Sequence, residues 1–307
     1  MSLPDDSSLT PLEYRNVRKE AERALKESGA YGVFPTPVDA IMSAANITEV
    51  KEDILSPSFI DKLRKEAVKF GDILKRAASK VLGIFHAPSG LVFLDRSVLK
   101  VRRRFISLHE SGHGFMPWQR AMYAHVEESE KSLTPGPAEL FDREANVFAT
   151  EVLFQLDHFH KQAEEYKFGL RTPIDLAKKY DASIYASIRQ YVSKNTRNCA
   201  VVVLNMPKFA EEMGYCSSLR RFVQSESFTN MFGKQQWKSI YTPDDPLGAM
   251  VPLAISRSSG QRTLAITDLN GIQHECIAEA FTNTYQVFVL LYPSKEMTAS
   301  RIIMPAA

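Results

Sequence analysis

Two histidines and a glutamate stand within five consecutive residues, His109-Glu110-Ser111-Gly112-His113, which have the form HExxH. On a helix, residues four positions apart lie one above the other on the same face, so both imidazoles can reach one ion. Zinc binds histidine nitrogen at about 2.0–2.1 Å. Glu110 is then placed to hold and deprotonate a water on that ion. The pattern predicts a zinc-dependent hydrolytic site with Glu110 as its base.

A third protein ligand is expected, because catalytic zinc sites usually combine three protein ligands with one water. A histidine six residues after His113 would complete one known pattern, but Gln119 stands there. Asp142 and Asn146 are four residues apart in a predicted helix, so they face the same way. The Asp142 carboxylate could bind the ion while the Asn146 amide steadies a ligand histidine. We therefore predict His109, His113 and Asp142 as metal ligands and Asn146 as their support.

Two helices and a small sheet must position these side chains. One helix is predicted to begin after Ser97, to carry the HExxH residues and to end at 115–118, where Pro117 interrupts it. A longer helix is predicted from about Ala138 to Phe159. Two short apolar runs, Val81–His86 and Leu91–Leu94, are separated by a turn-forming segment and predict a hairpin.

The combined motifs resemble the ImmA/IrrE family of metallopeptidases. Members of that family show an HELGH-type motif and, further along the chain, a stretch of the form E-x-E-A-N-x-F-A-x-x-L-L. Here the corresponding residues are His109–His113 and Asp142–Leu153. The resemblance extends over roughly residues 12–195.

This resemblance implies one Zn2+ ion held by His109, His113 and Asp142, with Glu110 as the catalytic residue; another divalent ion, such as iron or manganese, is the alternative. Asp142 stands where the family usually has Glu, so its side chain is one methylene shorter. Glu144 is the alternative third ligand. The two acidic residues are separated by about 200° around an ideal helix, so both cannot face one ion. We favour Asp142.

The resemblance also implies a regulatory metalloendopeptidase that cleaves a protein substrate such as a helix-turn-helix transcriptional repressor. The alternative is a non-catalytic regulator, a DNA- or protein-binding module that has retained the metallopeptidase fold. Residues 171–197 contain six basic and two acidic residues, which a DNA-reading helix would favour. Solvated helices often carry as much charge, so we expect no direct nucleic-acid binding.

Composition and charge narrow the class of protein. The chain has 307 residues, of which 44% are hydrophobic and 24% charged, as expected of a folded globular protein. A net charge of +2 gives no general attraction to nucleic acid. The first residues are polar and acidic, and no apolar run approaches the ~20 residues of a membrane span. Three cysteines without a CxxC pair suit a reducing compartment, so we expect a cytoplasmic protein without membrane contact.

An α+β architecture with two domains is expected. Residues 1–197 are predicted to form a zincin-like metallopeptidase domain, with its active-site core at about 80–160 and helix-turn-helix-like accessory helices at 172–195. Residues 198–307 are predicted to form a smaller mixed α/β domain that senses a ligand or selects the substrate. This boundary is placed where β-rich runs begin to recur, at Cys199–Leu204, Pro252–Ser256, Thr263–Thr267 and Val287–Tyr292.

Overall fold

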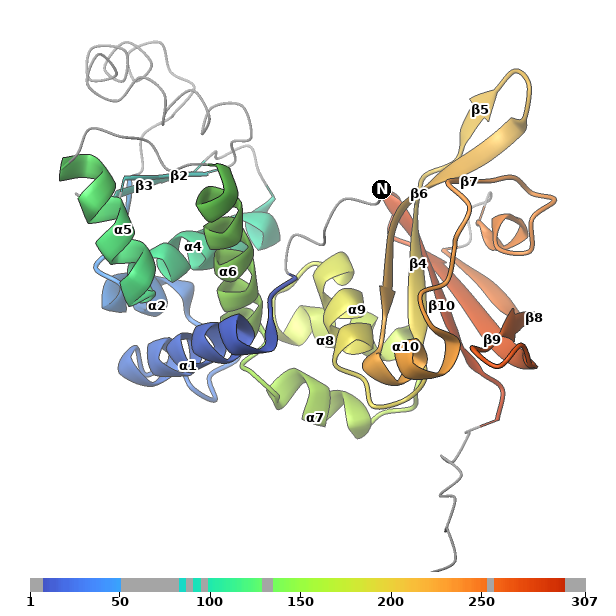
Figure 1. Cartoon of the computed structure of the whole chain (residues 1–307), viewed down its shortest axis with the longest axis horizontal. Helices are drawn as coiled ribbons and strands as arrows, with labels where there is room; N and C mark the ends of the chain where they lie inside the picture. Colours follow the sequence, from blue (N-terminus) through green and yellow to red (C-terminus); the bar gives the residue numbers. More distant parts are fainter. Residues whose placement is uncertain are drawn as a thin grey trace, which may run out of the picture. The chain divides into compact units, whose positions relative to one another are not determined.

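The chain contains two compact units, each with helices and strands (Figure 1). The computed structural model describes residues 8–50, 83–86, 91–94, 99–128, 135–252 and 257–295. The first unit comprises Met1–Phe159 with Lys178–Ser183, and the second comprises His160–Ala177 with Ile184–Ala307. The mixed α and β content agrees with the expected class, whereas the zincin-like assignment stays a prediction.

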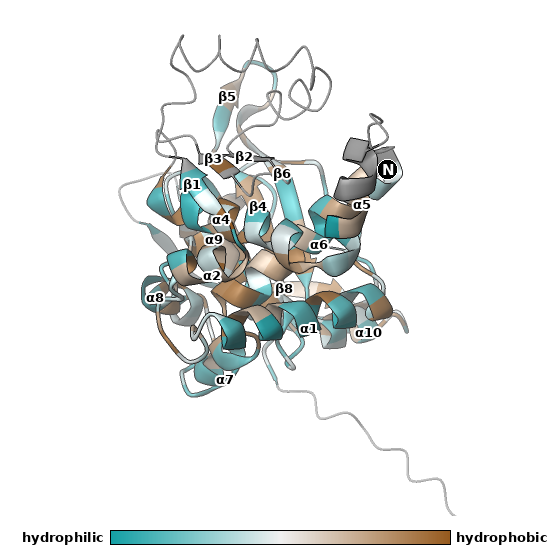
Figure 2. Cartoon of the chain, turned by 90° about the vertical axis from the view of Figure 1, so that its left-hand side faces the viewer, coloured by the Kyte–Doolittle hydropathy of each residue, from teal (hydrophilic) through white to brown (hydrophobic). Residues whose placement is uncertain are grey.

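Helices dominate the first unit. They are α1 (Pro11–Glu27), α2 (Val38–Ala44), α4 (Lys100–Phe115), α5 (Pro117–Glu128) and α6 (Pro135–Leu153), with α7 (His158–Glu164) beginning where this unit ends. A capping box opens α1, because the Thr10 side chain accepts from the Glu13 amide and the Glu13 carboxylate accepts from the Thr10 amide. Figure 2 shows hydrophilic and hydrophobic bands alternating along α1, as expected of a helix with one buried face.

Close packing of α4 against α6 brings the two predicted groups of ligands together. Ala145, Phe148 and Ala149 form part of the buried face of α6. A Cβ atom on Gly112 of α4 would lie only 3.0 Å from the Phe148 ring. Glycine at this position therefore allows the two helices to approach more closely than a larger residue would.

The ends of α4 follow the sequence prediction in part. The helix ends at Phe115 as predicted, while its predicted cap, Ser97, lies outside the described residues. The chain then re-enters a helix at once, because Pro117 occupies the first turn of α5, where its missing N–H costs no hydrogen bond. Helix α5 was not predicted from the sequence.

The long helix predicted to reach Phe159 ends earlier, at Leu153. Gln155 and Leu156 adopt positive φ angles of 54° and 59°, which break the helix before α7 begins. The break escaped prediction because apolar residues continue through it: Phe154, Leu156 and Phe159 are all buried.

A three-stranded sheet completes the first unit. Its strands are β1 (Thr48–Val50), β2 (Gly83–His86) and β3 (Leu91–Leu94), in the order β1-β3-β2. The β2–β3 pair is antiparallel, which confirms the predicted hairpin, and β1 runs parallel to β3. Helix α4 contacts both β2 and β3, so the helix that carries the HExxH residues lies on this sheet.

An antiparallel sheet organises the second unit. Its strands are β4 (Ala200–Asn205), β5 (Lys208–Ala210), β6 (Gly214–Gln224), β7 (Ile240–Tyr241), β8 (Ser258–Thr267), β9 (Gln273–Thr282) and β10 (Gln286–Pro293). The main order is β5-β6-β4-β10-β9-β8, with β7 paired to β6. The predicted runs at 199–204, 263–267 and 287–292 correspond to strands β4, β8 and β10, and most of the fourth run, at 252–256, lies outside the described residues. Strand β9 was missed, because the residues that alternate into its core are small: Cys276, Ala278 and Ala280.

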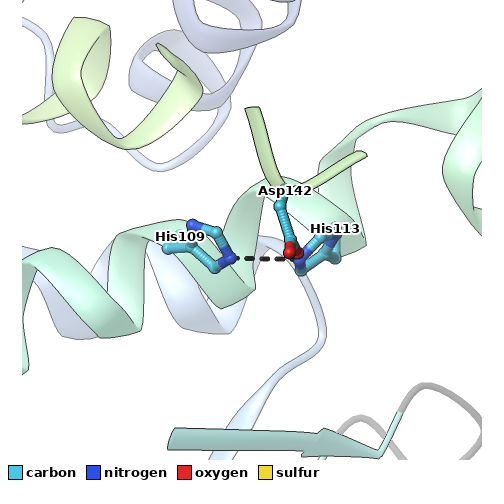
Figure 3. A group of neighbouring side chains, drawn as sticks. All are labelled: His109, His113 and Asp142. Atoms are coloured by element: carbon cyan, nitrogen blue, oxygen red, sulfur yellow. Dashed lines mark hydrogen bonds between the residues drawn. The ribbon is translucent and has the colours of Figure 1, made fainter. Parts of the chain in front are cut away.

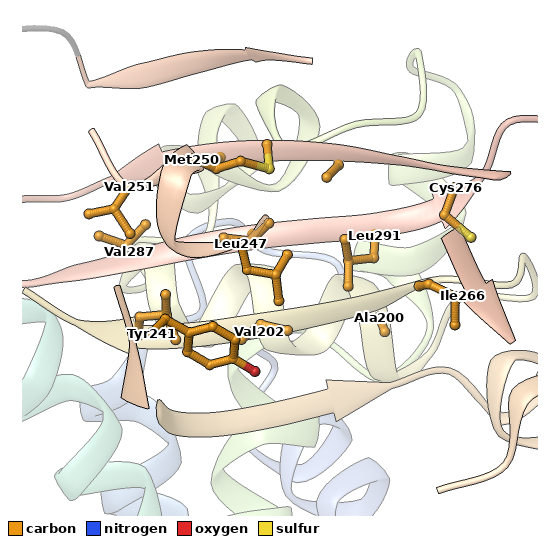
Figure 4. Packing of buried hydrophobic residues seen from close by; sticks show 14 of the residues in the cluster. Ala200, Val202, Tyr241, Leu247, Met250, Val251, Ile266, Cys276, Val287 and Leu291 are labelled. Carbon is orange, nitrogen blue, oxygen red and sulfur yellow. The ribbon is translucent and has the colours of Figure 1, made fainter. Parts of the chain in front are cut away.

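Both faces of this sheet are covered. On one face, residues of β4 and β10 such as Val202 and Leu291 pack with Tyr241 and Met250 (Figure 4). The short helix α10 (Glu226–Phe232) adds to the same cluster through two phenylalanines. Helix α9 (Ile184–Ser193) contacts β4 and β6, and its Tyr185 ring lies 6.4 Å from that of Phe288 in β10.

The two predicted accessory helices exist, as α8 (Arg171–Lys179) and α9, with Asp181 at a positive φ of 47° between them. Their grouping differs from the predicted boundary near residue 197, because α9 packs on the sheet of the second unit. Only the connecting segment Lys178–Ser183 belongs to the first unit. There Asp181 pairs with Lys100 and Arg104 of α4, at 3.2 and 3.3 Å.

No helix among the described residues combines the length and the apolar character needed to cross a membrane.

Candidate metal centre

The three predicted ligands lie together. His109 and His113 project from successive turns of α4, and Asp142 projects from α6 toward them (Figure 3). One ligand atom from each residue lies within 4.8 Å of the others. The two Nε2 atoms face each other at 3.3 Å, the separation that the dashed line in Figure 3 marks. His113 is buried, His109 is half-buried and Asp142 is exposed, so the group opens to solvent at its carboxylate.

The separation of the two imidazole Nε2 atoms suits a small divalent ion. Two nitrogens bound tetrahedrally to zinc at about 2.0–2.1 Å lie about 3.3 Å apart. The observed Nε2 separation, 3.3 Å, has this value. Two imidazoles and a carboxylate are also donor types that zinc accepts. The group could therefore hold a metal ion.

Asn146 stands where the sequence predicted it. It lies one turn after Asp142 in α6, and its Oδ1 is 3.0 Å from His109 Nδ1. Since an amide oxygen can only accept, His109 donates through Nδ1 and keeps Nε2 unprotonated toward His113.

Glu144 points elsewhere. Its Oε2 accepts hydrogen bonds from Trp118 Nε1 at 2.8 Å and from Gln119 Nε2 at 2.6 Å, and the residue is buried. The group that converges with the histidines contains Asp142 and not Glu144. The helix geometry that separates the two acidic side chains explains why one is near the histidines and the other is buried behind them.

Gln119 contacts His113, and sequence reasoning assigned it no role. Its Oε1 lies 2.6 Å from His113 Nδ1, so each histidine has an amide oxygen behind it. The available signal was its position, six residues after His113, which the immediate start of α5 at Pro117 folds back toward the site. Without a prediction of α5, that proximity could not be inferred.

Burial sets the charge states of the site. It lowers the pKa of His109 to about 3, with a further contribution from neighbouring His113, and it also lowers the pKa of His113. Both imidazoles are therefore neutral near pH 7, the form in which histidine binds metals. Burial, and then the nearby Asp142 carboxylate, raise the pKa of Glu110 to about 8.

Two arginines fix the ends of α4. Arg104 donates to the carbonyl oxygen of Thr36 at 2.6 Å, and Arg23 donates to that of Phe115, the last residue of α4, at 2.8 Å. These bonds tie the helix to α1 and to the segment before α2. Such anchoring matters because a shift of about 1 Å can disable a catalytic geometry.

Comparisons with known proteins are sparse. No protein-family model matches the chain, and no curated protein matches it. Among solved structures, the chain is similar to a Mycobacterium tuberculosis transcriptional regulator, with 15% sequence identity and a TM-score of 0.49. The match covers 93% of this chain and 95% of that chain. This likeness is too distant to carry an argument about function, so the family resemblance stays a prediction from the motifs.

Proposed function

We propose that this protein is a zinc-dependent endopeptidase. His109, His113 and Asp142 would hold the ion, and the observation that carries the proposal is the 3.3 Å separation of the two Nε2 atoms beside a carboxylate. When bound, the ion supplies a water of lowered pKa and polarises the scissile carbonyl group.

Glu110 supplies the proton transfers in this proposal. It accepts a proton from the attacking water and passes it to the leaving amine nitrogen as the peptide C–N bond breaks. Its surroundings support such a role. The three other buried glutamates among the described residues each accept hydrogen bonds from side chains. Glu151 accepts from Tyr14 and Arg18, and Glu20 accepts from Arg23. Glu144 accepts from Gln119 and Trp118.

Glu110 is only 8% exposed, yet no described residue donates a hydrogen bond to its carboxylate. Burial of a carboxyl group without such a donor costs free energy, and a catalytic role would offset that cost. This difference favours a catalytic protein over a non-catalytic regulator that retains the fold.

The substrate class follows from the motif resemblance stated above. It is a protein, such as a helix-turn-helix transcriptional repressor, cleaved in the cytoplasm. Zinc is the first choice of ion because of the HExxH motif. Iron(II) would accept the same two imidazoles and one carboxylate, whereas manganese would suit them less closely because it prefers oxygen ligands.

Three purified proteins test the proposal: the wild type, Glu110→Gln and Asp142→Ala. Bound zinc is measured by elemental analysis, and cleavage of a proteome-derived peptide mixture is followed by mass spectrometry. Glu110→Gln should keep its zinc and lose about 10²–10⁴-fold in cleavage rate, the usual contribution of a general base. Asp142→Ala should lose zinc. Equal cleavage by the wild type and Glu110→Gln would refute the assigned mechanism, whereas zinc binding without any cleavage would favour the non-catalytic alternative.

A further inference from the structure

A buried chain of hydrogen bonds stands behind His113. Trp118 and Gln119 both donate to Glu144 Oε2, at 2.8 and 2.6 Å. The same Gln119 nitrogen lies 3.3 Å from the carbonyl oxygen of Phe141, and Gln119 Oε1 lies 2.6 Å from His113 Nδ1. Gln119 is fully buried and Glu144 is 4% exposed, so water does not compete for these groups.

The donors and acceptors in this series of hydrogen bonds can be arranged in one direction only. A carboxylate oxygen and a backbone carbonyl oxygen accept hydrogen bonds, and an indole N–H only donates. Reversing the Gln119 amide would place its oxygen against Glu144 Oε2 and against the Phe141 carbonyl oxygen, with no proton between any of them. Buried acceptors facing each other in this way are costly. The donating end of Gln119 therefore faces Glu144, and its accepting end faces His113.

We propose that Gln119, oriented by Glu144, holds the proton of neutral His113 on Nδ1 and so keeps Nε2 available as a lone pair beside His109 and Asp142. A neutral imidazole carries one proton on either nitrogen, and only the unprotonated nitrogen can bind a metal. Gln119 is thus a positioning residue, and its consequence for the ion rests on the metal function proposed above.

The alternative tautomer would close the site. With its proton on Nε2, His113 would donate to His109 Nε2 across the 3.3 Å that separates them. That hydrogen bond would satisfy both nitrogens and leave neither for an ion. The Gln119 oxygen opposes this tautomer because it accepts the proton on His113 Nδ1. The orientation of the Gln119 amide therefore matters even before an ion binds.

The test compares wild type with Gln119→Leu, which removes the acceptor at nearly constant volume. Gln190→Leu is the matched control: Gln190 is 3% exposed, belongs to the second unit, and its Nε2 has no hydrogen-bond partner among the described residues. Nitrogen-15 NMR of the metal-free proteins reports which nitrogen of His113 carries the proton. Competition with a chelator reports the dissociation constant for zinc.

Wild type and Gln190→Leu should carry the His113 proton on Nδ1 and share one zinc affinity. Gln119→Leu should shift proton population to Nε2 and weaken zinc binding about 10–100-fold, as loss of such supporting residues usually does. A wild-type proton on Nε2 would overturn the inference without any variant. An unchanged tautomer and affinity in Gln119→Leu would overturn it too. A wild-type proton on Nδ1 in a protein that binds no zinc would uphold the inference and defeat the metal function instead.

Discussion

The two units differ in what they bury. Among the described residues, the first unit buries Glu20, Glu110, Glu144 and Glu151 together with His113. The second unit buries polar residues as well, but they are neutral: Thr172, Ser187, Gln190, Ser217, Ser225, Thr282 and Gln286. Its core is the apolar cluster around β4 and β10. Because burying an ionisable group costs far more than burying a hydroxyl or an amide, this contrast supports the proposal that the chemistry lies in the first unit.

The contrast also separates two kinds of stability. Between α4 and α6, hydrogen bonds hold polar side chains in fixed orientations. Around β4 and β10, apolar side chains stabilise the unit by being buried, and their contribution depends little on orientation. Substitutions in the two units should therefore affect different measurements.

Leu291→Ala should have the largest effect on folding. Leu291 is fully buried in β10, and removing such a side chain typically costs about 2–5 kcal/mol. Urea unfolding of the variant should show this loss, while its dissociation constant for zinc stays at the wild-type value. A matching loss of zinc affinity would erase the distinction between the units.

Asn146→Ala should show the opposite pattern. Loss of the 3.0 Å contact with His109 Nδ1 should weaken zinc binding about 10–100-fold, since the imidazole is no longer held in one orientation. Because Asn146 is only half-buried, the urea midpoint should move little. Chelator competition and urea unfolding, measured on one preparation, would test this expectation. A large loss of stability with normal zinc affinity would show that Asn146 supports folding and not the site.

Gly112→Ala should change both the free energy of unfolding and the zinc affinity, each by less than the variants above. The added Cβ would lie 3.0–3.3 Å from atoms of the Phe148 side chain, so α4 and α6 must separate slightly. The expected cost is about 1 kcal/mol, the low end for overpacking, together with weaker zinc binding as Asp142 moves from the histidines. Gly136→Ala on α6 is the control, because nothing lies within 4 Å of its added Cβ. Equal behaviour of the two variants would show that helix spacing does not set the site.

Sequence spacing predicted the parts of the site that depend on one helix at a time. The four-residue separations predicted that His109 shares a face with His113 and Asp142 with Asn146, because helical periodicity fixes which residues share a face. The contact of Gln119 with His113 could not be derived in this way. This contact depends on α5, and Pro117, the first residue of α5, was interpreted in the sequence as the end of the preceding helix.

The same limit applies to the fold. The hairpin of β2 and β3 and the strands β4, β8 and β10 have apolar patterns that indicate strands directly. The break at Gln155 has no such pattern, because its amide is held by residues more than a hundred positions away, at Gly32 and Ala30. Tertiary hydrogen bonds, and not local preference, decide where α6 ends.

The exposure of Asp142 beside two sheltered imidazoles has a kinetic consequence. In the proposed site, an ion arriving from solvent would meet the Asp142 carboxylate before it reaches either nitrogen. Asp142 would then contribute to the affinity for the ion and also lie on its path of entry and exit.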